Sequence, residues 1–152
     1  MINTCASVQL SVNHINMHRI NVGLHELFQA LSDPSRVRIV KLMISAQSEV
    51  CLCELSEALE EPEYKLSRHV KLLKTNGLIT SIRDGKWIYH SLVKDQKYLK
   101  LIFAAVEQFP DSDKQSAKDF TRFKKRKLLR EGGRCQQPSR IADSWEGKVK
   151  LP

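Results

Sequence analysis

Apolar residues between positions 22 and 76 recur every three to four residues, which is the spacing of helices that bury one face. The pattern predicts four helices, at residues 22–31, 34–44, 51–59 and 63–76. Asp33 can cap the second helix, and Pro34 suits its first turn because proline lacks only an N–H that has no partner there. The third and fourth helices are short and close together, which is typical of a helix-turn-helix.

The hydrophobic period changes after the fourth helix. Residues 78–83 and 86–92 are rich in β-branched and aromatic side chains, and Asp84-Gly85 separates them. An Asp-Gly pair between two such runs predicts a β-hairpin, because its turn needs positive φ angles. A helix-turn-helix followed directly by a hairpin indicates a winged helix-turn-helix, an α+β fold that is mostly α, with a two-stranded β-hairpin as its wing.

A last helix is expected at residues 96–109, and its apolar residues extend nearly all the way round it. A helix of that kind must be buried, and so small a domain has little interior left for it. We therefore expect it to form a subunit interface. The chain then divides into an N-terminal arm at residues 1–20, a winged-helix DNA-binding and dimerisation domain at 21–109, and a basic, flexible tail at 110–152.

The basic character of the chain is concentrated in this tail. The 152 residues have a formal net charge of +8, and residues 110–152 contain twelve Lys and Arg against six Asp and Glu. A basic excess suits a polyanion such as DNA. It equally describes a tail that is only solvated, so charge does not decide the function.

Several classes of protein are not expected. No run reaches the roughly 18 apolar residues of a membrane helix. The N-terminus is unlike a secretory signal, because its first cationic residue is Arg19 and asparagines interrupt its apolar stretch. We therefore expect a cytoplasmic protein without a membrane partner. The sequence has no phosphate loop, no nucleophile elbow and no paired carboxylates in a catalytic context, so an enzyme is not expected.

Cys51 and Cys53 form the sharpest chemical motif. Four cysteines are too few for a disulfide scaffold, and closely spaced cysteines in a reducing compartment more often serve metal or redox chemistry. Thiolates prefer soft ions such as arsenic(III), antimony(III), cadmium, lead and zinc. Residues two apart on a helix do not face each other, so one shared ion requires Cys51 at the helix start or a distorted first turn. The alternative is that both are small core side chains.

Several motifs resemble those of the ArsR/SmtB family of repressors, and they occur in the family's order. Residues 27–39 (LFQALSDPSRVRI) resemble the family's opening, and residues 50–55 (VCLCEL) resemble the Cys-Val-Cys-Asp-Leu box of its arsenic and cadmium/lead sensors. Residues 66–73 (LSRHVKLL) resemble its recognition helix, and residues 77–79 and 84–90 resemble its wing. The match covers about residues 22–109.

The resemblance implies a homodimer that pairs through the first and last helices of the domain. It implies a transcriptional repressor that has no resident cofactor and binds double-stranded operator DNA with inverted-repeat symmetry. It also implies release from the operator when an inducer ion binds the thiolates of Cys51 and Cys53. Arsenite or antimonite is the leading inducer, followed by cadmium or lead.

The sequence departs from the family at the third ligand. Arsenic sensors with this box often carry a third cysteine three positions after the second, where this chain has Ser56. Cys5 in the arm or Cys135 in the tail could supply that ligand, and the sequence favours neither. The family's other site, made by carboxylates and histidines on the last helix, is not expected because residues 94–109 contain no histidine and only two acids, Asp95 and Glu107.

The predicted DNA-binding residues lie on the helix at 63–76 and at the tip of the wing. With the apolar stripe of that helix turned inward, five side chains face outward: Tyr64, Lys65, Ser67, Arg68 and Lys71. Arg68 could contact a guanine edge through two hydrogen bonds, and the others suit phosphates. His69 either joins this set or packs at the helix shoulder. Arg83 and Lys86 flank the wing turn and suit DNA backbone or minor-groove contacts.

Two other functions remain open at this point. The same fold could carry a thiol redox switch made from two of the four cysteines. It could also be an architectural or partner-binding winged helix whose cysteines are inert. Both alternatives keep the winged helix and differ in what the cysteines do.

Overall fold

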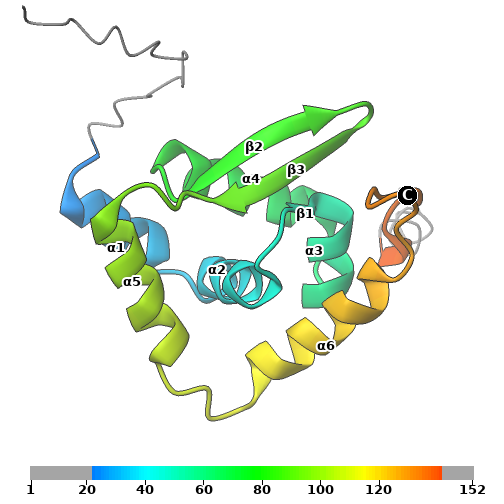
Figure 1. The fold of residues 1–152 in the computed structure, drawn as a ribbon. Helices are drawn as coiled ribbons and strands as arrows, with labels where there is room; N and C mark the ends of the chain where they lie inside the picture. The colour runs from blue at the N-terminus through cyan, green and yellow to red at the C-terminus, as the bar shows by residue number, and fades with distance from the viewer. Residues whose placement is uncertain (1–21, 142–152) are drawn as a thin grey trace, which may run out of the picture.

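The computed structural model describes residues 22–141 and confirms a mostly helical winged-helix fold with a small antiparallel sheet (Figure 1). The predicted arm, with Cys5, lies outside the described residues. Within that range, no helix is both long and apolar enough to span a bilayer. The elements in chain order are α1 (Leu24–Leu31), α2 (Pro34–Ala46), β1 (Val50–Cys51), α3 (Leu52–Leu59), α4 (Glu63–Thr75), β2 (Ile79–Asp84), β3 (Trp87–Leu92), α5 (Lys97–Gln108) and α6 (Gln115–Lys127).

Helix α2 lies at the centre of the fold, in contact with α1, α3, α4, α5 and α6. The sequence starts this helix as predicted, because Asp33 accepts a hydrogen bond from the backbone N–H of Arg36 at 3.1 Å and Pro34 is the first helical residue. Its fully buried Ile39 and Val40 belong to one hydrophobic core that the helices and the sheet share. This core sets the positions of α3 and α4, the two helices of the helix-turn-helix.

The predicted hairpin is formed by β2 and β3, which pair along their whole length. Gly85 has a φ of 60°, a positive value as predicted, but the loop lies one residue later than predicted: Asp84 pairs with Trp87, and Gly85 and Lys86 form the turn. The sequence pattern does not predict β1, which pairs with β3 and makes the sheet three-stranded in the order β1-β3-β2. This extra strand places Cys51 opposite Tyr89.

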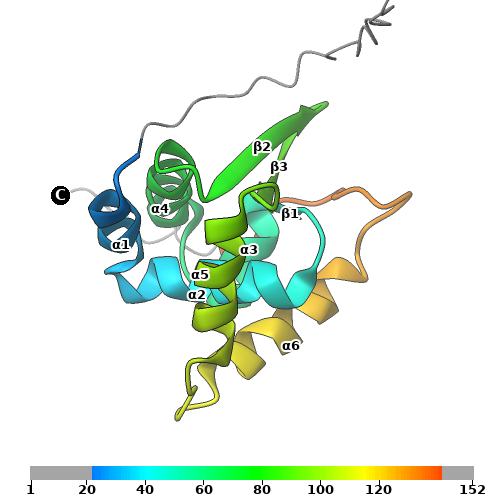
Figure 2. The ribbon, with the colours of Figure 1, turned by 60° about the vertical axis from the view of Figure 1, so that its left-hand side comes forward.

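The chain after α5 differs from the flexible tail expected at residues 110–152. Residues 115–127 form α6, which packs along α3 and α2, and the chain that follows α6 lies beside α3 (Figure 1, Figure 2). Phe123 of α6 is 1% exposed and joins the core. The apolar stripe of this segment is too short to predict a stable helix, because most helical stability comes from tertiary packing that a local pattern does not contain.

Helix α5 buries less of its surface within the chain than its apolar composition predicts. Leu99 and Phe103 are buried, whereas Leu101 is 73% exposed and Tyr98 is 49% exposed. The side of α5 that carries Leu99 and Phe103 packs on α2. A part of its apolar surface is therefore left facing outward in the single chain.

Candidate metal centre and nucleic-acid interface

Three cysteine sulfurs meet in the interior, and they come from two distant parts of the chain. The Sγ atoms of Cys51, Cys53 and Cys135 all lie within 4.8 Å of one another. The Sγ of Cys135 is 2.8 Å from that of Cys51 and 3.7 Å from that of Cys53. All three side chains are buried. Of the two candidate third cysteines, the structure brings Cys135 to the pair, while Cys5 is outside the described residues.

The local backbone explains how two cysteines separated by one residue can converge. Cys51 is not inside the helix but is the N-cap of α3, with extended angles of φ −89° and ψ 163°. Cys53 lies in the first turn of that helix. The extended conformation of Cys51 gives its side chain a direction that an interior helical residue does not have. Cys51 therefore stands at the start of the helix, as one ion shared by Cys51 and Cys53 requires.

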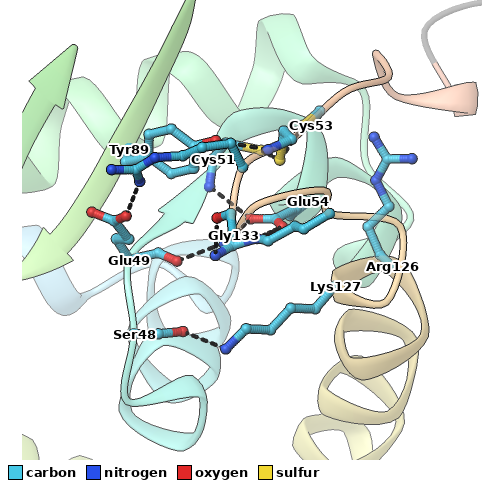
Figure 3. Close-up of polar contacts among 12 residues, drawn as sticks. Ser48, Glu49, Cys51, Cys53, Glu54, Tyr89, Arg126, Lys127 and Gly133 are labelled. Carbon is cyan, nitrogen blue, oxygen red and sulfur yellow. Dashed lines mark hydrogen bonds and ion pairs between the residues drawn. The ribbon is translucent and has the colours of Figure 1, made fainter. Parts of the chain in front are cut away.

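A ladder of ion pairs joins the segment that contains α6 to the segment that contains α3, and Figure 3 shows its acids Glu49 and Glu54 near the cysteines. Arginines recur every four residues along α6 and the chain after it, and acidic residues recur from Glu49, just before β1, to Glu60, the C-cap of α3. The pairs are Arg122 with Glu60, Arg126 with Glu57, Arg130 with Glu54 and Arg134 with Glu49. Because the partners run in opposite directions along the chain, the ladder fixes the antiparallel register of α3 and α6.

Glu54 is the central acid of this ladder, and its residue is fully buried. Its carboxylate accepts from Arg130 through Nε at 2.5 Å and Nη2 at 2.7 Å. The same carboxylate accepts from the backbone N–H of Cys51 at 2.9 Å, which closes the first turn of α3. One side chain therefore orders both the cysteine at the helix start and the end of α6 that leads to Cys135.

Tyr89 of β3 holds the other side of the cluster. Its hydroxyl oxygen accepts a hydrogen bond from the backbone N–H of Cys135 at 2.8 Å, and its side chain packs in one cluster with all three cysteines. The guanidinium groups of Arg130 and Arg134 lie 5.6 Å and 4.7 Å from the ring centroid. The wing strand thus contacts the segment that carries the third thiol.

Hydrogen bonds, burial and a nearby arginine give the three thiols different pKa values. Hydrogen bonds with Cys135 and then with Cys51 lower the pKa of Cys53 to about 3, and Arg126 adds to this effect. Hydrogen bonds with Cys135 and then with Cys53, together with burial, raise the pKa of Cys51 above its usual range. For Cys135, the bond with Cys51 lowers the pKa, but the bond with Cys53 and burial outweigh it and raise the pKa to about 12. Cys53, beside Arg126, is thus the cysteine of the three whose pKa is lowered, whereas the pKa values of Cys51 and Cys135 are raised.

The chemistry of this arrangement suits a soft, thiophilic ion. Thiolate sulfur is the preferred ligand of such ions, and hard ions prefer oxygen. An ion replaces the protons of the thiols that it binds, so binding to all three sulfurs releases protons and becomes stronger as the pH rises. Within the described residues, no fourth cysteine, histidine or carboxylate belongs to the group.

The predicted DNA-binding side chains of α4 mostly face solvent. Arg68 and Lys71 are exposed. Lys65 pairs with Glu61 at 2.8 Å, and the hydroxyl of Ser67 donates to the backbone carbonyl of Tyr64 at 2.9 Å. Tyr64 itself is 52% exposed. These positions fit a helix that presents a polar face to a partner.

His69 lies differently from its neighbours on α4. Its Nδ1 is 3.8 Å from the carboxylate of Asp33, the N-cap of α2, and its side chain is 16% exposed. This is the shoulder position that the sequence left as an alternative. On the wing, Arg83 donates to the carbonyl of Gly85 at 3.2 Å, and the Nζ of Lys86 lies 5.1 Å from the ring centroid of Trp87.

A groove of about 440 Å³ separates α4 from the wing. Cys51 and Cys53 reach it from one side, and Lys71 and Lys86 of the predicted DNA surface line it as well. The buried thiol pair therefore lies directly behind the surface that the sequence assigns to DNA. The remaining lining residues are Leu52, Glu63, Ser67, Val70, Lys74, Ser81, Trp87, Ile88 and His90.

Sequence reasoning missed four side chains that build the thiol site: Glu54, Tyr89, Arg126 and Arg130. From the hydrophobic pattern of α3, Glu54 is expected to be an ordinary surface acid. Tyr89 is not distinguished from the other aromatic residues of the wing. One signal was available in the sequence, because arginines at 122, 126, 130 and 134 share a helical spacing of four. That spacing predicts a one-sided basic helix but not the acids that face it.

Comparison with known proteins identifies the helix-turn-helix region. Residues 33–81 match the family described as "Bacterial regulatory protein, arsR family", a segment that contains α2, β1, α3 and α4. The chain is similar to the arsenical resistance operon repressor of Escherichia coli, with 40% identity over 67 residues that cover 44% of this chain and 56% of that protein. It is also similar to an uncharacterised HTH-type transcriptional regulator of Methanocaldococcus jannaschii, with 30% identity over 79 residues that cover 51% of this chain and 88% of that protein.

The chain spans little more than half the length of the arsenic-resistance relatives it matches. Among solved structures, reduced HlyU from Vibrio cholerae is similar with a TM-score of 0.50 and 21% identity, covering 55% of this chain and 84% of that one. At this identity the likeness concerns the fold alone, and it agrees with a winged helix. Helix α6 and Cys135 lie outside the segment that matches the family.

Proposed function

The chain belongs to the ArsR family of transcriptional regulators, which are not enzymes, and on this premise we propose that it represses transcription until a soft ion binds Cys51, Cys53 and Cys135. One observation carries the proposal: three buried cysteine sulfurs lie within 4.8 Å of one another. Cysteines that only filled the core would not require ion pairs that hold Cys135, 82 residues after Cys53, beside the other two thiols.

We propose that the repressor binds DNA as a homodimer on an inverted repeat. Apolar side chains on α1 and α5 are left uncovered in the single chain, among them Leu24 at 63%, Phe28 at 58% and Leu101 at 73% exposure. Uncovered apolar surface of this kind marks a protein interface. A two-fold dimer presents two copies of α4, and two copies read two half-sites of opposite direction.

The proposed inducer is arsenic(III) or antimony(III), ahead of cadmium or lead. Three sulfurs can fill the three positions of a trigonal ion, whereas a divalent ion such as zinc is almost always held by four ligands in a closed site. The similarity to an arsenical resistance operon repressor supports this order. Cys135 takes the place of the third cysteine that Ser56 leaves missing on α3.

Ion binding would weaken DNA binding through the start of α3. An ion can shift the equilibrium toward the released state only by binding that state more tightly. Cys51 is the N-cap of α3, and α3 packs against the recognition helix α4. Pulling the Sγ atoms of Cys51, Cys53 and Cys135 onto one ion changes the geometry of that first turn, which supplies the required difference between the two states.

The test is a titration of the reduced, full-length protein bound to a DNA fragment selected for binding from a random library. Arsenite, antimonite, cadmium and lead are added in turn, with release followed by fluorescence anisotropy and sulfur–ion bonds by ultraviolet absorption. We expect release at near-stoichiometric arsenite or antimonite. The Cys51→Ser, Cys53→Ser double variant and the Cys135→Ser variant should stay on the DNA.

The Cys5→Ser variant is the matched control, because it removes a cysteine that the sequence offered as the other third ligand. We expect it to respond as the natural chain does. Loss of the response in Cys5→Ser but not in Cys135→Ser would reject Cys135 as a ligand. Release by peroxide but by none of the four ions would instead support the thiol redox switch, and no response to either would leave an architectural winged helix.

A further inference from the structure

Two buried hydroxyl groups connect the segment after Cys135 to the turn of the helix-turn-helix. The Oγ of Ser139 donates to the Oγ of Ser56 at 3.0 Å, and the Oγ of Ser56 donates to the backbone carbonyl of Glu61 at 2.6 Å. Both serine residues are fully buried. Glu61 lies in the turn between α3 and α4, and its own N–H donates to the carbonyl of Ser56 at 3.2 Å.

The hydrogen bonds from Ser139 to Ser56 and from Ser56 to Glu61 form a relay, and one end of this relay is attached to the thiol site. Ser139 follows Cys135 by four residues, and the chain between them is held by Arg126, which donates to the carbonyls of Gln137 and Pro138. Arg140 continues the attachment, because its backbone N–H donates to Glu57 of α3 at 3.1 Å. Cys135 and Ser139 are therefore joined by a short segment that hydrogen bonds hold in place.

At its other end the relay reaches the recognition helix. Glu61 is followed by Pro62, the N-cap of α4, whose carbonyl accepts the first backbone hydrogen bonds of that helix. Glu63 in the first turn of α4 lines the same groove as Cys51 and Cys53. The start of α4 therefore lies beside the thiol site.

We propose that the hydrogen bonds from Ser139 to Ser56 and from Ser56 to Glu61 transmit ion binding at Cys135 to the recognition helix α4. This inference rests on the proposed function and adds the residues that couple its two sites. Neither serine is a ligand or a DNA contact, so both act as positioning residues. Ser56 has the position of the missing family cysteine, and its hydroxyl serves here as the middle of the relay.

The experiment measures two quantities separately in the full-length protein, the affinity for arsenite by sulfur–ion absorption and the ratio of DNA dissociation constants with and without arsenite. The variants are Ser139→Ala and Ser56→Ala. We expect both to bind arsenite and, without the ion, DNA within about two-fold of the natural chain. The ratio of DNA dissociation constants should fall by roughly 3- to 10-fold, the scale of one net hydrogen bond.

The double variant Ser56→Ala, Ser139→Ala sharpens the test. If the two hydroxyls act as one relay, its ratio should equal that of either single variant, because the second removal breaks a connection already lost. Thr121→Ala is the matched control, since it removes an exposed hydroxyl of α6 that donates to the carbonyl of Ala117 at 2.8 Å within the same helix. It should leave the ratio unchanged.

Different results overturn different claims. An unchanged ratio in correctly folded serine variants, checked by near-ultraviolet circular dichroism, would reject the relay and leave the repressor intact. Loss of arsenite affinity in these variants would also reject it, because the serines would then shape the site rather than couple it. If the natural chain binds arsenite and stays on DNA, the proposed function itself fails.

Discussion

The exposed face of α4 and the buried thiol cluster are adjacent, yet they are built in opposite ways. The face of α4 is made by residues within thirteen positions of one another, on one helix, with side chains in solvent. The cluster joins the start of α3 to a segment more than eighty residues later, and its side chains are buried, with Cys51 and Cys53 bordering the groove beside α4. Ion pairs between α3 and α6 are what bring its parts together.

This difference has a consequence for how each region responds to substitution. A side chain on the exposed face can be removed without disturbing the fold, because it contacts few other residues. A side chain at the α3–α6 contact supports both the stability of the chain and the geometry of the thiols. Substitutions at the α3–α6 contact should change the free energy of unfolding and the affinity for the ion together. Substitutions on the exposed face of α4 should change DNA binding alone.

The largest effect is expected from Phe123→Ala. Phe123 is 1% exposed and anchors α6 in the core, so its removal should lower the free energy of unfolding by about 3–5 kcal/mol. Arsenite affinity should fall as well, because Cys135 depends on α6. Chemical denaturation and thiol–ion absorption measure the two effects. Leu128→Ala, at an 83% exposed residue just after α6, is the control and should change neither; a mild effect of Phe123→Ala would mean that α6 is dispensable.

Arg130→Ala should destabilise the chain by about 3 kcal/mol, since it leaves the buried carboxylate of Glu54 without its cation. Arsenite affinity should fall at least about ten-fold, because Glu54 also holds the start of α3 at Cys51. Arg140→Ala removes a 74% exposed partner of Glu57 and should cost less than about 1 kcal/mol. Equal effects of the two variants would show that the ladder does not position the thiols.

Arg68→Ala tests the other side of the comparison. It should weaken binding to the selected DNA by roughly 1–3 kcal/mol and reduce discrimination against random DNA, with no change in thermal unfolding. Lys118→Ala on α6 also removes one exposed positive charge and serves as the control. Equal losses on selected and random DNA would reassign Arg68 from base recognition to phosphate contact.

The smallest effect concerns His90, at the boundary of the two regions. Burial and then Lys74 lower its pKa to about 4, from 6.5. A histidine whose pKa is lower in the folded chain stabilises it fully above pH 6.5, and this stabilisation is lost as the pH falls toward 4. The contribution of His90 to the free energy of unfolding should fall by about 1 kcal/mol between pH 7 and 5.5. His90→Gln should reduce this pH dependence, and an identical slope in both proteins would contradict the assignment.

The sequence by itself determined the winged helix, because each of its elements is specified locally. Periodic apolar residues predict α1 to α5, Asp33-Pro34 starts α2, and Asp84-Gly85 marks the hairpin to within one residue of its observed loop, Gly85-Lys86. It also gave the position of the thiol pair, since a shared ion requires Cys51 at the start of a helix. Such features depend on residues within a few positions of one another, so their physical cause can be read from the sequence.

Only the tertiary structure decided that Cys135 joins the pair and that residues 115–127 are a packed helix. The same is true of Glu54, which looks like a surface acid until Arg130 is placed opposite it. These contacts form between segments about eighty residues apart, and their strength comes from burial and from charges that face each other across α3 and α6. A single segment contains only one partner of each pair, so its own pattern cannot reveal the contact.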